Sequence, residues 1–242
     1  MRVNLSGGDG GVPEVLFLAA PESSGAWSPS ILYALDGENG TVKWETDREF
    51  QPVSSPVLGD LVNDEKLEVV AVGLNQRDVV VLDHGGHVLG RYDTGGSVSN
   101  LALADLDGDG AAEIIAPVNN QVTALTVDLD ADGKLIVAER WRTTGTGGCG
   151  SPYGAPYCIP SVADVDLDGR PDIVMGNRIV DSDGATKYLN AALSDGFVAI
   201  GNFDDVMVAT MSFRLGDQPS RSPSAVVAQS LPAIRPAISF SA

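Results

Sequence analysis

One pattern, an acidic turn followed directly by an apolar strand, recurs along this chain and constrains its fold more than any other feature. Residues 104–116 read ADLDGDGAAEIIA, and residues 163–175 read ADVDLDGRPDIVM. Units with this outline cover residues 52–96, 97–145 and 160–188, a first unit starts inside its turn at residue 7, and a fifth begins at 195–205. A period of about 40–50 residues with short strands in each unit is typical of the blades of a β-propeller.

The residues inside each unit favour strands over helices. Short runs rich in Val and Ile lie between Gly, Asp and Asn residues, at 68–73, 79–83, 113–118, 122–128 and 172–176. No stretch sustains apolar residues at the helical spacing i, i+3, i+4 and i+7, so we expect almost no helix. Asp- and Gly-containing segments at 36–40, 83–86, 130–133 and 181–184 are expected to be hairpin turns. We therefore predict an all-β fold, an incomplete β-propeller of about four blades, each a four-stranded antiparallel sheet.

Four aromatic residues, Trp44, Tyr92, Trp141 and Tyr188, each follow a turn glycine by an even number of positions. Side chains an even number apart on a strand face the same side, so each aromatic is expected on the face of its glycine. Packing between neighbouring blades is a better explanation for these residues than stacking against a ligand.

The acidic turns have the donor spacing of a calcium loop. Counted from the first aspartate, oxygen donors stand at positions 1, 3, 5 and 9, a glycine at position 6 reverses the chain, and a backbone carbonyl is available at position 7. The predicted ligands are Asp105, Asp107, Asp109, Ala111 (carbonyl) and Glu113 in one loop, and Asp164, Asp166, Asp168, Arg170 (carbonyl) and Asp172 in the other. An EF-hand is excluded, because its position 12 would be Ala116 or Met175.

The alternative is that these segments are ordinary Asp-Gly turns without an ion. Carboxylates 4 Å apart repel by roughly 4 kcal/mol per pair at an effective dielectric near 20, so a simple turn would gain nothing from four of them. The turn at 130–133 lacks an acid at position 9, where Ile136 stands, and is interpreted as a plain hairpin. A worn copy at 60–68 retains Asp60, Asp64 and Glu68 and is expected to bind calcium weakly or not at all.

Composition limits the partners and the environment of the chain. The formal net charge of -18 argues against nucleic acid and anionic membrane surfaces as partners. No apolar run reaches the roughly 20 residues of a membrane span, and the N-terminus lacks the apolar core of a signal peptide. The only cysteines, Cys149 and Cys158, lie in a Gly/Pro-rich segment with no evident core to fill, which favours a disulfide over two separate thiols.

The pattern D-x-D-x-D-G-x-x-[DE] before a β-branched strand resembles the FG-GAP/VCBS repeats of integrin α-chain-like β-propellers. Residues 102–118 and 161–177 carry the resemblance, 58–73 is a degenerate member, and 31–46 resembles the strand-turn-strand of PQQ-type propeller repeats. The resemblance spans roughly residues 5–205 and implies a secreted or cell-surface protein, usually with a seven-bladed ring, that functions in adhesion or carbohydrate binding. Residues 206–242 depart from it and are expected to form an irregular tail, disordered or out of frame.

No motif for a nucleophile, a zinc site or a phosphate loop is present, and His84 and His87 are expected to be exposed and not catalytic. The leading hypothesis is a calcium-binding extracellular or cell-surface propeller that binds an unknown protein or glycan without catalysis and without inserting into a membrane. The alternatives are the propeller domain of a secreted polysaccharide-degrading enzyme, or a truncated, non-functional fragment.

Overall fold

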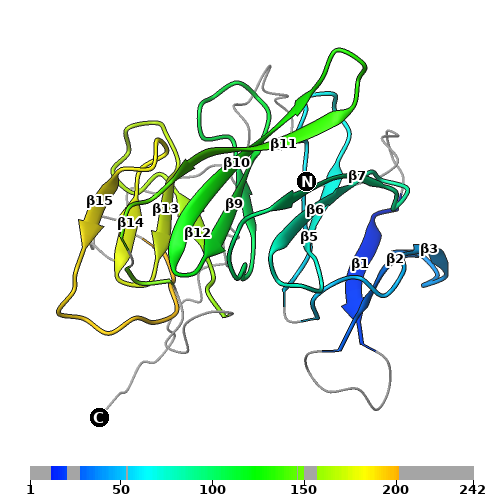
Figure 1. Cartoon of the computed structure of the whole chain (residues 1–242), viewed down its shortest axis with the longest axis horizontal. Helices are drawn as coiled ribbons and strands as arrows, with labels where there is room; N and C mark the ends of the chain where they lie inside the picture. The colour runs from blue at the N-terminus through cyan, green and yellow to red at the C-terminus, as the bar shows by residue number, and fades with distance from the viewer. Residues whose placement is uncertain (1–11, 21–27, 53, 146, 150–156, 202–242) are drawn as a thin grey trace, which may run out of the picture.

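The structure is a computed structural model that describes residues 12–20, 28–52, 54–145, 147–149 and 157–201. This part of the chain forms fifteen strands and contains no helix, in agreement with the prediction (Figure 1). The strands are β1 (Glu14–Ala19), β2 (Ile31–Asp36), β3 (Val42–Glu45), β4 (Val57–Gly59), β5 (Glu68–Val72), β6 (Asp78–Leu82), β7 (Val88–Asp93), β8 (Ala102–Ala104), β9 (Glu113–Val118), β10 (Gln121–Leu129), β11 (Leu135–Arg142), β12 (Ser161–Ala163), β13 (Asp172–Met175), β14 (Arg178–Val180) and β15 (Thr186–Leu189).

The strands form four antiparallel sheets in which chain neighbours pair with one another. The second, third and fourth sheets are β4–β7, β8–β11 and β12–β15, and the first sheet, β1–β3, has three strands among the described residues. The three four-stranded sheets coincide with the sequence units 52–96, 97–145 and 160–188. The described part of the fifth unit, up to residue 201, contains no strand.

Successive sheets pack face to face, which explains why their middle strands are apolar on both sides. Val70 and Val72 of β5 pack toward the third sheet, whereas the alternate residues Val69 and Ala71 pack toward the first sheet. All of these side chains are fully buried. A strand with two buried faces has no polar alternation to display, so the runs of Val and Ile in the sequence mark the centres of the sheets.

The sheets follow one another in chain order across the view, from β1–β3 on the right to β12–β15 on the left (Figure 1). The first strands of the second, third and fourth sheets are neighbours, because β4 contacts β8 and β8 contacts β12. The acidic turns of the second and third sheets also touch. The backbone N–H of Ala112 donates to the carbonyl of Asp60 at 2.9 Å, and the Asn63 amide donates to the carbonyl of Asp109 at 3.4 Å.

Three of the four aromatic residues pack between sheets, as predicted, and the two tryptophans do so against the turn of the next sheet and not their own. The Trp44 ring covers Gly86, and its indole N–H donates to the carbonyl of His84 at 2.9 Å. Trp141 covers Gly184 in the same way.

Tyr92 and Tyr188 differ from these two tryptophans. Tyr92 packs at the edge of the core between the second and third sheets, but the strand register puts Gly90, not Tyr92, at the position equivalent to Trp44. Tyr188 occupies the equivalent position in the fourth sheet and is 53% exposed. The predicted inter-sheet packing of Tyr188 is therefore not found among the described residues.

The predicted hairpin turns are all present. Segment 130–133, which has the first half of the calcium pattern, connects β10 and β11 as a plain hairpin, with Asp130 accepting the N–H groups of Asp132 and Lys134 at 2.9 and 2.8 Å. In the described residues no helix has the length and apolarity to cross a bilayer. The predicted boundary between residues 205 and 206, and the tail after it, lie outside the described residues.

Candidate metal centres in two acidic loops

The loop at 105–113 is wound around its first carboxylate. Asp105 accepts the backbone N–H of Gly108 at 2.6 Å through Oδ1 and that of Gly110 at 3.0 Å through Oδ2. Both glycines have positive φ, +81° and +97°, a conformation that side chains with a Cβ rarely adopt. Asp109 in turn accepts the N–H of Ala111 at 2.8 Å. The loop thus directs alternate carboxylates toward one side, as the predicted calcium loop requires.

The loop at 164–172 repeats this arrangement. Asp164 accepts the N–H groups of Asp168 and Gly169 at 3.1 and 2.9 Å, and Asp168 accepts that of Arg170 at 2.9 Å. Gly169 again has a positive φ of +91°. The two loops therefore adopt similar conformations although the residues between their acids differ.

The acid at position 9 is buried in each loop and opens the second strand of its sheet. Glu113 accepts the N–H of Leu106 at 2.7 Å, and Asp172 accepts the N–H of Val165 at 3.1 Å. Burial raises the pKa of the Glu113 carboxyl above its usual value, an effect that the Leu106 N–H partly offsets. A buried carboxylate of this kind is costly to keep ionised unless a cation or hydrogen bonds compensate its charge.

The spacing of the oxygens fits a calcium ion. One carboxylate oxygen from each of Asp105, Asp107 and Asp109 lies within 4.8 Å of the others, and Asp164, Asp166 and Asp172 form a second such group. Oxygens bound to one calcium at 2.3–2.6 Å can be at most about 5 Å apart, so each group could share one ion. The other two predicted acids, Glu113 and Asp168, belong to the same loops but lie outside these groups.

In the third and fourth sheets a cationic side chain from the outermost strand contacts the loop acids, and neither cation was among the predicted site residues. Arg140 of β11 is ion-paired with Asp107 and lies 3.3 Å from Glu113. Lys187 of β15 lies 2.8 Å from both Asp166 and Asp172. The hydrogen bond from Arg140 lowers the pKa of Asp107, and those to Asp166 and then Asp172 raise the pKa of Lys187. The sequence offers no sufficient signal: each cation directly precedes an aromatic residue, but so does Arg91 before Tyr92, and Arg91 pairs with Glu49.

The worn copy at 60–68 keeps the fold of the loop without a comparable group of oxygens. Asp60 accepts the N–H groups of Asp64 and Glu65 at 3.1 and 2.9 Å, and Glu68 accepts that of Leu61 at 2.9 Å. Asp64 is paired with its neighbour Lys66 at 2.8 Å. Asp60, Asp64 and Glu68 form none of the close groups of three found in the described residues.

Cys149 and Cys158 form the predicted disulfide, with 4.8 Å between their Cα atoms. The premise that these cysteines have no core to fill is wrong, because both are fully buried in the cluster between the third and fourth sheets. The bridge therefore stabilises the contact between two sheets and does not simply close a surface loop.

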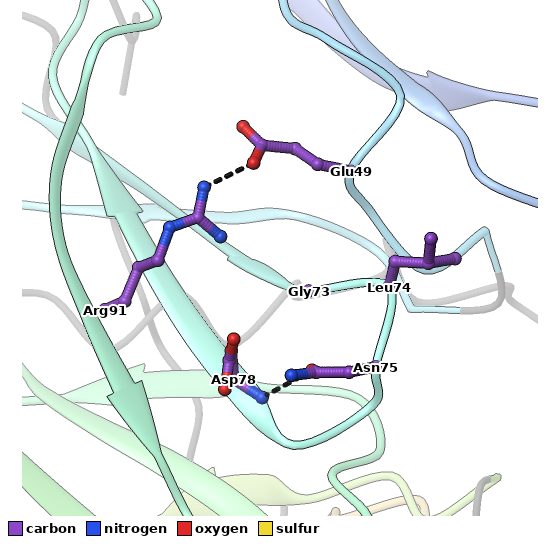
Figure 2. Close-up of a pocket in the computed structure, with 6 residues that line it drawn as sticks. All are labelled: Glu49, Gly73, Leu74, Asn75, Asp78 and Arg91. Carbon is purple, nitrogen blue, oxygen red and sulfur yellow. Dashed lines mark hydrogen bonds and ion pairs between the residues drawn. The ribbon is translucent and has the colours of Figure 1, made fainter.

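Two shallow surface hollows lie outside the acidic loops. One, of about 360 Å³, is lined by residues that include Glu49, Asn75 and Arg91, and there the Arg91 guanidinium is paired with Glu49 (Figure 2). A second, of about 580 Å³, lies between β7 and β11. Neither lining contains an aromatic residue or a nucleophile beside a base, and His84 and His87 are exposed, as expected.

No protein-family model matches the chain, and no curated protein matches it by sequence. Solved structures with a similar fold include the V. cholerae biofilm matrix protein Bap1, with 21% identity, a TM-score of 0.54, and coverage of 78% of this chain and 29% of that chain. Rhamnogalacturonan lyase YesW has 20% identity, a TM-score of 0.57, and coverage of 77% and 41%. The Bacillus licheniformis rhamnogalacturonan lyase PL11 has 19% identity, a TM-score of 0.55 and the same coverage as YesW. At these identities the likeness shows the fold alone, and the chain spans less than half the length of each structure.

Proposed function

We propose that this chain is a calcium-stabilised β-propeller module of the FG-GAP/VCBS type, part of a larger ring, that binds a protein or glycan ligand outside the cell. One observation carries the proposal. In two successive sheets, three carboxylates of a Gly-turned loop bring their oxygens within 4.8 Å of one another beside a buried strand. The succession of such sheets along the chain supports the propeller architecture.

The role of calcium in this proposal is structural. The ligands would be the carboxylates of Asp105, Asp107, Asp109 and Glu113 with the carbonyl of Ala111, and those of Asp164, Asp166, Asp168 and Asp172 with the carbonyl of Arg170. Calcium accepts six to eight oxygens, so protein and water oxygens together complete its shell. Its charge offsets the repulsion of the clustered acids, which would stabilise the connection between the first and second strands of each sheet.

Two features support an extracellular location and a matrix or glycan ligand. The buried Cys149–Cys158 bridge is of a kind that persists in oxidising compartments. In addition, a biofilm matrix protein and two rhamnogalacturonan lyases share the fold.

The second candidate, a propeller domain of a polysaccharide-degrading enzyme, is favoured by the two rhamnogalacturonan lyases. The two hollows do not support it, because neither contains a recognisable pair of catalytic groups. We place ligand binding first, because the acidic loops that carry the proposal would hold a structural ion and offer no reacting group.

Binding to immobilised acidic and neutral polysaccharides and to matrix proteins, with calcium and with EGTA, tests the proposal. Calcium-dependent retention without cleavage supports the binding module. Release of unsaturated sugar ends from an acidic polysaccharide would instead establish the lyase alternative. Neither retention nor cleavage on any of these ligands, by a chain that binds calcium, would contradict the proposed ligand class.

A further inference from the structure

Each sheet has a β-bulge at one equivalent place in its outermost strand. The register between the last two strands shifts by one residue there, at Ala34/Leu35, Val81/Leu82, Ala124/Leu125 and Ile179/Val180. The residues that the register passes over are Lys43, Leu89, Arg140 and Lys187. A bulge re-aims the side chain at which it occurs, so these four residues are expected to point in a similar direction relative to their sheets.

In three sheets the bulge residue is a cation. In the third and fourth sheets it pairs with the acid that opens the second strand, β9 or β13, and in the first sheet it pairs with the acid that opens β1. Lys43 pairs with Glu14, Arg140 with Glu113, and Lys187 with Asp172. The acid side chains are only 3%, 5% and 1% exposed. A buried acid facing a cation from the far edge of the same sheet is thus a repeated element of this fold.

The second sheet lacks this element, because its bulge residue is Leu89. Glu68, the equivalent acid, is 6% exposed, and no ion pair to it is found among the described residues. The same sheet has the degenerate acidic loop. In this sheet the bulge cation and the complete calcium pattern are both missing.

We propose that the bulge cation is a built-in counter-ion that stabilises the acid at position 9 when no metal is bound, and that Arg140 and Lys187 must move away when calcium binds. The second half of this inference rests on the proposed calcium function; the first half does not.

The geometry at Lys187 shows why the two cations compete. Its Nζ lies 2.8 Å from Oδ2 of Asp166 and 2.8 Å from Oδ1 of Asp172, the acids at positions 3 and 9. A calcium ion bound to the same carboxylates would stand 2.3–2.6 Å from their oxygens, and so close to the ammonium group. Two cations at that separation repel strongly, so binding of either one weakens the binding of the other to the same acids. Arg140 has the same relation to Asp107 and Glu113.

The test compares Lys187→Met with Lys43→Met and the parent chain. Calcium binding is measured by calorimetric titration, and metal-free stability by thermal unfolding in EGTA. Methionine keeps an apolar stem and removes the charge. We expect both variants to unfold at a lower temperature in EGTA than the parent. Only Lys187→Met should bind calcium more tightly, by about tenfold or more at one site, because a charge-assisted hydrogen bond no longer has to be broken.

A converse variant keeps the inference testable if Lys187→Met does not fold. Leu89→Lys supplies the missing cation to Glu68 and should raise the unfolding temperature in EGTA. An unchanged or lower unfolding temperature of Leu89→Lys would contradict the proposed counter-ion role. Unchanged or weaker calcium binding by Lys187→Met would contradict the proposed competition between Lys187 and calcium. If the parent and Lys187→Met both fail to bind calcium, the proposed calcium function and the competition are contradicted. The unfolding temperatures of Lys43→Met and Leu89→Lys then still test whether the bulge cation acts as a counter-ion.

Discussion

The indole N–H of Trp141 donates a 3.1 Å hydrogen bond to the carbonyl of Ser182, from the outermost strand of the third sheet to the hairpin turn of the fourth. Trp44 and the carbonyl of His84 have the same relation between the first and second sheets, at 2.9 Å. An amphipathic side chain is suited to this position, because its ring packs on a bare glycine while its N–H satisfies a turn carbonyl. These contacts fix neighbouring sheets to one another outside the apolar core.

Gly184→Ala should therefore destabilise the chain more than Gly133→Ala. Both glycines have positive φ, +90° and +76°, so alanine is strained at either position. A Cβ at Gly184 would also stand 2.7 Å from the Trp141 ring, whereas the space around Gly133 is open. We expect a loss of about 1 kcal/mol for Gly133→Ala and a further 1–3 kcal/mol, roughly, for Gly184→Ala, measured by denaturant unfolding. Equal losses would show that Trp141 does not pack tightly on this turn.

Reduction of the Cys149–Cys158 bridge should lower the melting temperature. The cysteines are nine positions apart, and the bridge lies in the core between the third and fourth sheets. Disulfides of short loops contribute about 2–3 kcal/mol, which corresponds to roughly 5–10 °C for a domain of this size. A scan with and without a thiol reductant measures the shift. The Cys149→Ala/Cys158→Ala double variant is the control and should not respond to the reductant.

Glu68→Gln should stabilise the metal-free chain at neutral pH. Burial raises the pKa of the Glu68 carboxyl, with the charges of Asp64 and Asp60 adding to the effect against the N–H of Leu61. A raised folded-state pKa means that folding favours the protonated form, so the ionised group weakens the fold at high pH. This cost disappears as the pH falls below the pKa of the same carboxyl in the unfolded chain, near 4.5. The glutamine side chain of the variant stays neutral and can still accept the Leu61 N–H.

Thermal unfolding of the parent and Glu68→Gln in EGTA between neutral and acidic pH measures this effect. The advantage of the variant should be largest near neutral pH and should shrink toward zero as the solution approaches pH 4.5, the unfolded value, while the contributions of other acids cancel between the two proteins. A difference that does not change with pH would show that ionisation of Glu68 has no cost in the fold.

Asp109→Asn and Asp168→Asn should each remove about half of the stabilisation that calcium provides, because each affects one of two independent sites. Both residues stand at position 5, and the asparagine oxygen can still accept the N–H of Ala111 or Arg170. Asp132→Asn is the matched control, since its hairpin has the same spacing of aspartates but no acid at position 9. Melting temperatures with calcium and with EGTA give the comparison. A response of Asp132→Asn equal to that of the other two would show a general charge effect.

The repeat, the strands and the turns could be predicted from the sequence because they depend on local composition and on period-2 alternation. The counter-ions could not. A β-bulge adds one residue to a strand and moves the following side chains to the opposite face, so alternation counted from the turn gives the wrong side. An even count from the turn gives the face of a strand but not the position along it, so Tyr92 was grouped with the two tryptophans although Gly90, two residues earlier, holds the equivalent position. The burial of Cys149 and Cys158 was missed because it depends on contacts between sheets that are distant in sequence.

Calorimetric titration of calcium into the chelator-treated chain tests the central claim most directly. With carboxylate oxygens grouped within 4.8 Å in both loops, we predict two bound ions per chain and a higher melting temperature in the calcium-loaded state. Fewer than one ion per chain, with the same melting temperature in calcium and in EGTA, would contradict the account.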